Sequence, residues 1–176
     1  MNLPNKLTLT RVALIPLMVL LLYLPGAWRY AAAAVFALAA FTDYLDGHLA
    51  RSKGLVTNFG RFLDPVADKL LVLSALAMLV HTQQFPAYGL IVILSRELCV
   101  DGLRMVAVGQ GKVIAAGQLG KIKTVSQMFL ILYLILTQTH VYDTVLGVAG
   151  FVFVLGITLW SGVDYFMKNR TIISQK

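Results

Sequence analysis

Apolar residues along this chain fall into six long runs that are separated by short polar breaks. The runs cover about residues 7–24, 28–50, 62–80, 87–108, 122–137 and 142–166. Each run, if helical, is long enough to cross the hydrocarbon core of a bilayer. No break is long enough to be a linker between domains. The pattern therefore predicts an all-α, polytopic membrane protein with six transmembrane helices, forming a single domain over residues 1–176.

Individual residues refine this prediction. Pro65 is best tolerated in the first turn of a helix, so the third helix is expected to begin only shortly before Asp64. Cys99 is the only cysteine, which excludes an intramolecular disulfide, and its apolar neighbours predict a buried, inert thiol. Aromatic residues near the ends of the runs are typical of interfacial belts. These residues are Trp28, Tyr30, Phe85, Tyr88, Tyr142 and Tyr165.

The composition agrees with a membrane location. Hydrophobic residues make up 59% of the chain and charged residues only 13%, unlike an ordinary globular domain. The net charge is +7, but the basic residues lie at the ends of the apolar runs, where they can contact anionic lipid. They form no stripe that would bind nucleic acid. We therefore expect membrane lipids, and no nucleic acid, among the partners.

The distribution of Lys and Arg orients the six runs, because cytoplasmic connections carry the excess of positive charge. The connections on one side contain only Arg29. Those on the other side contain Lys6, Arg51, Lys53, Arg61, Lys112, Lys121, Lys123, Lys168, Arg170 and Lys176. Both termini, and the connection between the second and third runs, are therefore expected to face the cytoplasm.

Four of the eight acidic residues flank this second connection: Asp43, Asp46, Asp64 and Asp68. The members of each pair are three or four residues apart, so each pair shares a helix face. Four converging carboxylates would repel one another unless cations neutralise them, and Mg²⁺ and Mn²⁺ prefer such oxygen ligands. Two such ions roughly 4 Å apart form the usual clamp for attack on a phosphoryl group. The alternative, solvated helix ends at the membrane surface, explains one Asp pair better than two pairs with glycines between them.

The residues between the carboxylates fit a phosphate-bearing ligand. Gly47 and Ala50 continue the face of Asp43 with almost no side chain, so a bulky ligand can approach the backbone. Arg51 offers a planar fork that suits a phosphate. Gly60 is expected to keep the entry to the third helix open.

The pattern D-x2-D-G-x2-A-R-x8-G-x3-D-x3-D, from Asp43 to Asp68, resembles the signature of the CDP-alcohol phosphatidyltransferases at all eight fixed positions. The segments NLPNKLTLTRVALIP, SRELCVDGLR and GKIKT resemble the branch of this family that makes phosphatidylglycerophosphate. This resemblance, which covers most of the chain, implies transfer of a phosphatidyl group from CDP-diacylglycerol to sn-glycerol 3-phosphate with release of CMP. It also implies two Mg²⁺ or Mn²⁺ ions, a homodimer, and the bacterial inner (cytoplasmic) membrane as the location.

The resemblance also assigns roles to single residues. It makes Asp68, the last Asp of the motif, the general base as well as a metal ligand. Asn5, Thr8 and Arg11 recur at every third residue, a spacing that fits a helix cap and a snorkelling arginine equally well. The resemblance instead implies that this region binds the CDP end of the donor. The expected donor-binding residues are Asn5, Thr8, Arg11, Gly47, Ala50, Arg51, Thr57 and Gly60.

The fourth run contains four charged residues, of which Glu97, Asp101 and Arg104 fall near one face. Charged groups inside a spanning helix are costly unless they face a polar cavity or a partner. A structural ion-pair network would satisfy this condition. A pocket for an anionic acceptor, completed by lysines at the start of the fifth run, would also satisfy it. The residues expected to bind the acceptor phosphate are Arg96, Arg104, Lys121 and Lys123.

Two alternatives remain open at this stage. The same chemistry could use another acceptor, such as inositol phosphate, serine or phosphatidylglycerol. A divalent-cation transporter would explain the carboxylates, but it would not explain the motif's glycines, Arg51 or the cationic pocket. The sequence contains no evident covalent nucleophile with a paired base, which favours direct in-line attack over a phosphatidyl-enzyme.

Overall fold

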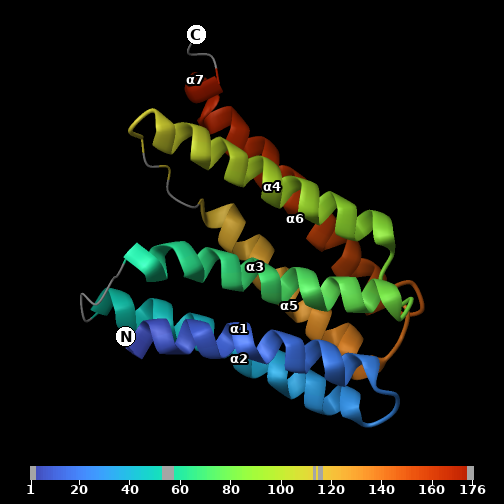
Figure 1. Ribbon diagram of the computed structural model, residues 1–176. Coiled ribbons are helices and arrows are strands. Elements are labelled where there is room, and N and C mark those ends of the chain that lie inside the picture. The colour runs from blue at the N-terminus through green and yellow to red at the C-terminus, as the bar shows by residue number, and fades with distance from the viewer. Residues whose placement is uncertain (1–2, 53–57, 113, 115–116, 174–176) are drawn as a thin grey trace. The chain divides into compact units, whose positions relative to one another are not determined.

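The computed structural model describes residues 3–52, 58–112, 114 and 117–173; for 3–5, 43–52, 58–62, 64 and 173 it describes the backbone but not the side chains. Within these residues the regular structure is helical, which confirms the all-α prediction (Figure 1). The helices are α1 (Leu3–Tyr23), α2 (Trp28–Ser52), α3 (Asn58–His81), α4 (Ala87–Gly109), α5 (Gln118–Thr137), α6 (Val145–Lys168) and the short α7 (Arg170–Ile173). Each of the six predicted runs corresponds to one of the helices α1–α6.

The chain divides into two compact units, which are described separately. Unit 1 comprises Met1–Gln84 and Ile131–Thr139, and therefore contains α1, α2, α3 and the end of α5. Unit 2 comprises Phe85–Leu130 and His140–Lys176, and contains α4, the first part of α5, α6 and α7.

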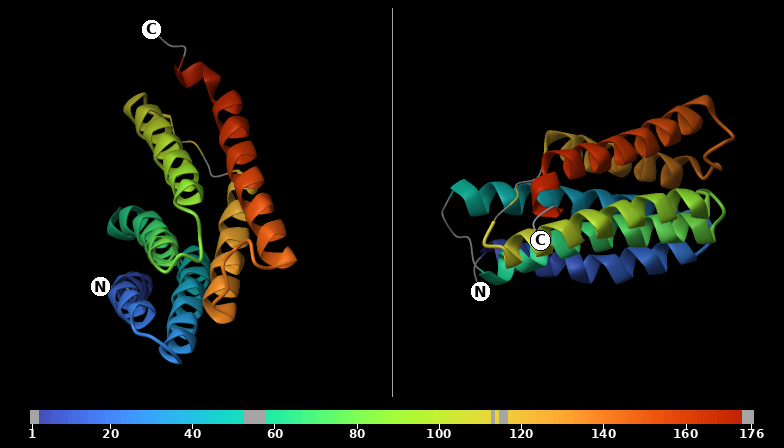
Figure 2. Two further views of the ribbon diagram at one scale, coloured as in Figure 1. Left: turned by 90° about the vertical axis from the view of Figure 1, so that its right-hand side faces the viewer. Right: turned by 90° about the horizontal axis from the view of Figure 1, so that it is seen from above.

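In unit 1, α1 packs against both α2 and α3 (Figures 1 and 2). Alanines on α2 allow this close approach, because Ala32 and Ala39 are completely buried and project only a methyl group. On α1 the buried side chains include Met18, at 0% exposure. The rings of Tyr23 and His81 stack with centroids 5.7 Å apart, which places the ends of α1 and α3 together. The two helices therefore run in the same direction, with α2 antiparallel to both.

A buried glutamine ties the elements of unit 1 together at the end where α2 begins and α3 finishes. Gln84 is 5% exposed and accepts a hydrogen bond from Arg29 Nη1 at 2.9 Å through its Oε1. Its Nε2 donates to the carbonyl oxygen of Leu134 on α5 at 2.8 Å. Thr82 Oγ1 donates to the same Oε1 at 2.9 Å. Gln84 thus links α2, α3 and α5 at one end of the unit.

In unit 2, α4 packs along α6 and runs in the same direction (Figure 2). Near the start of both helices, the rings of Phe85 and Phe151 meet edge to face at 5.4 Å. A Cβ atom on Gly89 would lie 2.8 Å from the first ring and 2.9 Å from the second, so only glycine fits there without displacing them. At the other end, an apolar cluster joins α4, α6 and α7. It consists of Val100, Leu103, Ala107, Tyr165 and Ile172.

The predicted start of the third helix was wrong. The helix α3 begins at Asn58, so Gly60 lies in its first turn and Pro65 lies in its interior. Proline removes one hydrogen bond from the helical ladder, but the adjoining bonds remain. Packing of the following turns adds support, since Ala67 and Leu71 are completely buried. The proline therefore does not set the helix boundary.

The predicted burial was also wrong at three positions. Cys99 is exposed, because α4 directs Glu97 and Val100 inward and leaves the thiol on the outer face. Phe85 and Tyr165, expected in an interfacial belt, are only 2% and 6% exposed. An outer face in contact with lipid is as apolar as a core, so hydropathy does not show which side of such a helix is buried.

Within the described residues, three helices contain stretches that are long and apolar enough to cross a membrane. These stretches are Lys6–Tyr23 in α1, Gln118–Thr137 in α5 and Val145–Lys168 in α6. A shorter apolar stretch, Trp28–Thr42, forms the first part of α2. These helices are those of a membrane protein.

Candidate active site

Two polar residues of α1 are completely buried. Thr8 and Arg11 each have 0% exposure, and their spacing places them on one face of the helix, as predicted. The Nε and Nη1 atoms of Arg11 are both buried. A snorkelling arginine would extend its guanidinium to the surface, so this reading of Arg11 is wrong. Asn5 is the third member of the group, and its side chain is not among those that the structure describes.

The Asp motif lies on two consecutive helices. Asp43, Asp46, Gly47, Ala50 and Arg51 belong to the last turns of α2, and Gly60, Asp64 and Asp68 belong to the first turns of α3. Because α2 is antiparallel to α1 and α3, its last turns lie at the same end of unit 1 as the first turns of the other two helices (Figure 1). The fold therefore brings both halves of the motif to the end that holds Thr8 and Arg11. Thr57 lies outside the described residues.

Asp68 is the only carboxylate of the motif whose side chain is described. It is half-buried, its Oδ1 atom is completely buried, and the adjacent Ala67 has no exposed surface. Among the described side chains no group of three or more His, Cys, Asp or Glu gathers. The side chains of Asp43, Asp46 and Asp64 lie outside that set.

In unit 2, a buried carboxylate binds two of the predicted acceptor-site cations. Glu97 Oε1 accepts hydrogen bonds from Lys123 Nζ and, at 3.2 Å, from Arg96 Nη1. The exposed fractions of the three side chains are 10%, 5% and 11% for Glu97, Lys123 and Arg96. The interaction joins α4 to α5 and leaves a net positive charge, since one carboxylate faces two cations.

Gly162 leaves room for the side chain of Arg96, and Gly120 lies near its guanidinium. A Cβ atom on Gly162 of α6 would lie 3.2 Å from Arg96 Cγ, and one on Gly120 of α5 would lie 3.8 Å from Nη2. Arg96 Nε is buried and has no hydrogen-bond partner within the described part of the chain. The arrangement therefore holds a largely buried guanidinium whose Nε makes no hydrogen bond to the described residues.

A third predicted cation, Arg104, binds a residue of α6. Its Nε donates a hydrogen bond to Tyr165 Oη at 3.0 Å, and its guanidinium carbon lies 5.5 Å from the centroid of the tyrosine ring. That distance is within the range of a cation–π contact. Arg104 follows Arg96 by a little more than two helical turns on α4.

A comparison of the sequence with models of known protein families gives a match to CDP-alcohol phosphatidyltransferase over residues 1–160. This chain belongs to the CDP-alcohol phosphatidyltransferase family. The match includes every position of the Asp motif, both buried polar residues of α1 and all four predicted acceptor-site cations.

Among relatives in this family, the chain is 44% identical to a CDP-diacylglycerol–glycerol-3-phosphate 3-phosphatidyltransferase of Bacillus subtilis (strain 168). That alignment extends over 188 residues and covers 96% of this chain and 95% of the relative. The proteins of the same name from Escherichia coli (strain K12) and Shigella flexneri are 40% identical over 176 residues, with the same coverage of both chains.

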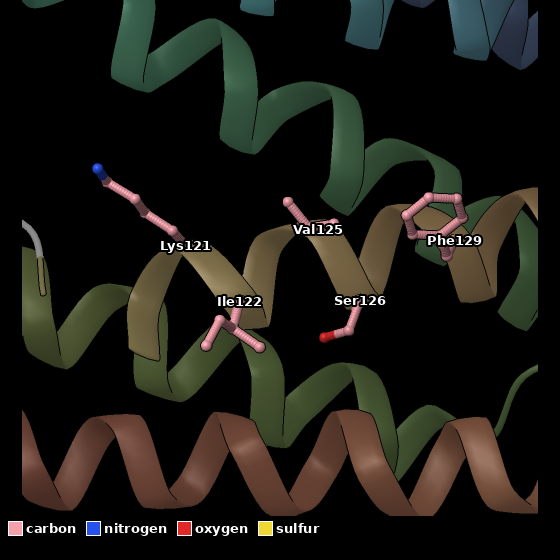
Figure 3. A pocket seen from close by; sticks show the side chains of 5 residues that line it. All are labelled: Lys121, Ile122, Val125, Ser126 and Phe129. Carbon is pink, nitrogen blue, oxygen red and sulfur yellow. The ribbon is translucent and has the colours of Figure 1, made fainter. Parts of the chain in front are cut away.

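The fourth predicted cation of this phosphatidyltransferase, Lys121, is exposed and lines an open hollow of about 350 Å³ along α5. Figure 3 shows that its ammonium group extends away from the apolar side chains around it. The other lining residues are Ile122, Val125, Ser126 and Phe129. Lys121 therefore differs from Lys123, which lies two residues further along α5, on nearly the opposite side of the helix, and is buried in an ion pair.

Two residues of unit 2, Glu97 and Tyr165, were not given a functional role from the sequence. Glu97 was placed in a charged face, but its ion pair with Lys123 depends on how α5 lies relative to α4. Tyr165 was assigned to an interfacial belt. Its position near the end of α6 carried no signal, because its partner is 61 residues away along the chain.

Proposed function

We propose that this chain transfers a phosphatidyl group from CDP-diacylglycerol to sn-glycerol 3-phosphate, giving phosphatidylglycerophosphate and CMP. The observation that carries the proposal is the 44% identity, over 96% of the chain, to a relative named for this reaction. The eight matching positions of the Asp motif support the phosphatidyl-transfer chemistry. The charged residues of unit 2 support a phosphate-bearing acceptor.

Asp43, Asp46, Asp64 and Asp68 are proposed to hold two Mg²⁺ or Mn²⁺ ions. Four carboxylates form the oxygen-rich donor set that these hard cations prefer, and members of the family are generally metal-dependent. When bound, the ions would neutralise negative charge on the donor pyrophosphate and on the departing CMP. The position of Asp68 fits this assignment, because it is half-buried at the end of unit 1 that carries the rest of the motif.

Asp68 is also proposed as the general base. It takes the proton of the acceptor's 1-hydroxyl while the hydroxyl oxygen attacks the phosphorus of the phosphatidyl group. The bond from that phosphorus to the oxygen of CMP breaks in the same in-line displacement. The products are phosphatidylglycerophosphate and CMP, with the proton on Asp68, so the step needs no other reactant.

The remaining residues at this end of unit 1 are proposed to bind the donor. Arg11 and Thr8 are buried polar groups that suit the CDP moiety, and Asn5 and Thr57 extend the same role. Gly47, Ala50 and Gly60 leave the backbone accessible, and Arg51 binds a donor phosphate. In unit 2, the acceptor phosphate binds the cations Arg96, Arg104, Lys121 and Lys123.

The six long helices are proposed to span the bacterial inner (cytoplasmic) membrane, with both termini and the active site on the cytoplasmic side. The distribution of Lys and Arg supports this orientation. In this orientation the soluble acceptor phosphate is on the same side of the membrane as the active site. The family resemblance further implies a homodimer, which the mass of the detergent-solubilised protein tests.

Release of CMP from CDP-diacylglycerol by the purified protein in detergent tests the proposal. The acceptors to compare are sn-glycerol 3-phosphate, glycerol, inositol phosphate, serine and phosphatidylglycerol, each with and without Mg²⁺ or Mn²⁺. We expect release that requires both a metal ion and glycerol 3-phosphate. Preference for another acceptor, or efficient use of unphosphorylated glycerol, would overturn the acceptor assignment. Absence of CMP release together with Mn²⁺ uptake into proteoliposomes would instead establish a transporter.

A further inference from the structure

The two cations Lys123 and Arg104 have partners of different charge. Lys123 binds the carboxylate of Glu97, which it shares with Arg96, so part of its charge is neutralised within the protein. Arg104 binds the neutral phenol of Tyr165, which fixes one edge of the guanidinium and leaves its charge intact. Among the described residues, Arg104 makes no ion pair, and its two Nη groups make no hydrogen bond. Arg104 is therefore the better placed of the two to attract an anion.

Tyr165 is itself held in place. It is 6% exposed and packs in the apolar cluster with Val100 and Leu103 of α4. Its carbonyl oxygen accepts a hydrogen bond from Asn169 Nδ2 at 2.8 Å, at the end of α6. A side chain fixed on both its ring and its backbone can restrict the rotamers of a flexible arginine that binds it.

We propose that Tyr165 is a positioning residue for the acceptor, acting through Arg104. It occupies Nε and thereby directs the two Nη groups to the acceptor phosphate as a preformed fork. A free arginine side chain loses rotamer entropy when it binds a ligand, and less is lost if the side chain is already held. This inference rests on the proposed function, because it concerns the phosphate-bearing acceptor of that reaction.

The substitution Tyr165→Phe tests the proposal, since it removes the hydrogen-bond acceptor and keeps the ring. We expect the KM for glycerol 3-phosphate to rise about three- to tenfold, the effect of one net hydrogen bond. We expect kcat and the KM for CDP-diacylglycerol to change by less than about twofold, because the donor does not use this contact. Tyr142→Phe is a matched control. It removes a tyrosine hydroxyl that contacts Tyr88 before the start of α6, and it should change neither constant.

A double-mutant cycle separates action through Arg104 from an independent role. Arg104→Ala should raise the KM for glycerol 3-phosphate at least about tenfold, because it removes hydrogen bonds to a charged group. Adding Tyr165→Phe to Arg104→Ala should then have no further effect. A further rise of the same size in the double variant, an unchanged KM in Tyr165→Phe, or an equal rise for both substrates would overturn the proposal.

A second measurement does not depend on turnover. It determines the Kd for glycerol 3-phosphate by calorimetry on the intact protein in detergent. If the wild type binds the compound without using it, the proposed function fails, and the Kd values of the variants still test Tyr165. Weaker binding in Tyr165→Phe but not in Tyr142→Phe is the expected result. Failure of the wild type to bind glycerol 3-phosphate overturns both the acceptor assignment and the role of Tyr165.

Discussion

Neutralising Glu97 should destabilise unit 2 more than almost any other single change of charge. Glu97→Gln removes the carboxylate and preserves nearly all of the side-chain volume. Lys123 and Arg96 both lose the shared oxygen as an ionic partner, and their side chains are only 5% and 11% exposed. Breaking a buried ion pair by removing one partner costs about 3–5 kcal/mol. We expect the upper part of this range, because two cations depend on one carboxylate.

Removing the lysine instead of the carboxylate should cost less folding stability. In Lys123→Met the carboxylate of Glu97 keeps Arg96 as a partner at 3.2 Å, so we expect a loss of about 1.5–3 kcal/mol. The double variant Glu97→Gln, Lys123→Met should lose less than the sum of the two single changes. The difference should be at least about 1 kcal/mol, since directly contacting residues couple by this order.

Unfolding in mixed micelles with a rising fraction of SDS, followed by far-ultraviolet circular dichroism, measures these losses. The control is the exposed ion pair on α6 between Lys168 and Asp164, in which Nζ and Oδ2 are 2.8 Å apart. Its lysine side chain is 71% exposed, so Asp164→Asn should change stability by no more than about 0.5 kcal/mol. Equal stability of Glu97→Gln and Asp164→Asn, or additive effects in the double variant, would refute the reasoning.

Three further predictions concern other parts of the chain. Asp64→Asn should lower CMP release by orders of magnitude without affecting folding, because it removes one ligand of the proposed metal pair. Near-normal turnover of this variant at saturating Mg²⁺ would exclude Asp64 as a metal ligand. In a variant that lacks Cys99, Gln83→Cys should react with an impermeant thiol reagent in intact cells, whereas Ser52→Cys should react only after permeabilisation. The reverse pattern would invert the proposed orientation. Gly147→Ala should lower the unfolding free energy by about 1–3 kcal/mol, since the added Cβ would overlap the carbonyl oxygen of Val141. Gly156→Ala, with open space around it, should be neutral or slightly stabilising.

The sequence predicted the helices well because their signal is local. Long apolar runs with polar ends mark each of α1–α6, and the fourth run, predicted at 87–108, differs from Ala87–Gly109 by one residue. Pro65 misled the prediction because its cost falls on a single hydrogen bond, which the rest of α3 outweighs. A proline therefore marks a helix end less reliably in a long apolar helix than in a short exposed one.

The candidate site was predictable only where its residues are close in sequence. The Asp motif carries its own spacing, and the resemblance to a family rests on it. Lys123 and Arg104 bind partners on other helices, so no local pattern reveals that Lys123 has a carboxylate partner and Arg104 a phenol. Burial was hardest to predict, as Cys99 and Tyr165 show, because an apolar residue can face either lipid or protein.

The distribution of charge among the helices also has a consequence for the insertion of the newly made chain. The helices α1, α5 and α6 contain stretches apolar enough to partition into a bilayer unaided, whereas α4 carries Arg96, Glu97, Asp101 and Arg104. A charged residue at the centre of a helix opposes insertion by roughly 2.5–3.5 kcal/mol. Glu97 has Arg96 beside it on α4, but its second cationic partner, Lys123, is supplied only when α5 has been synthesised. The two helices should therefore leave the translocon as a pair, and a chain that stops before α5 should insert α4 poorly.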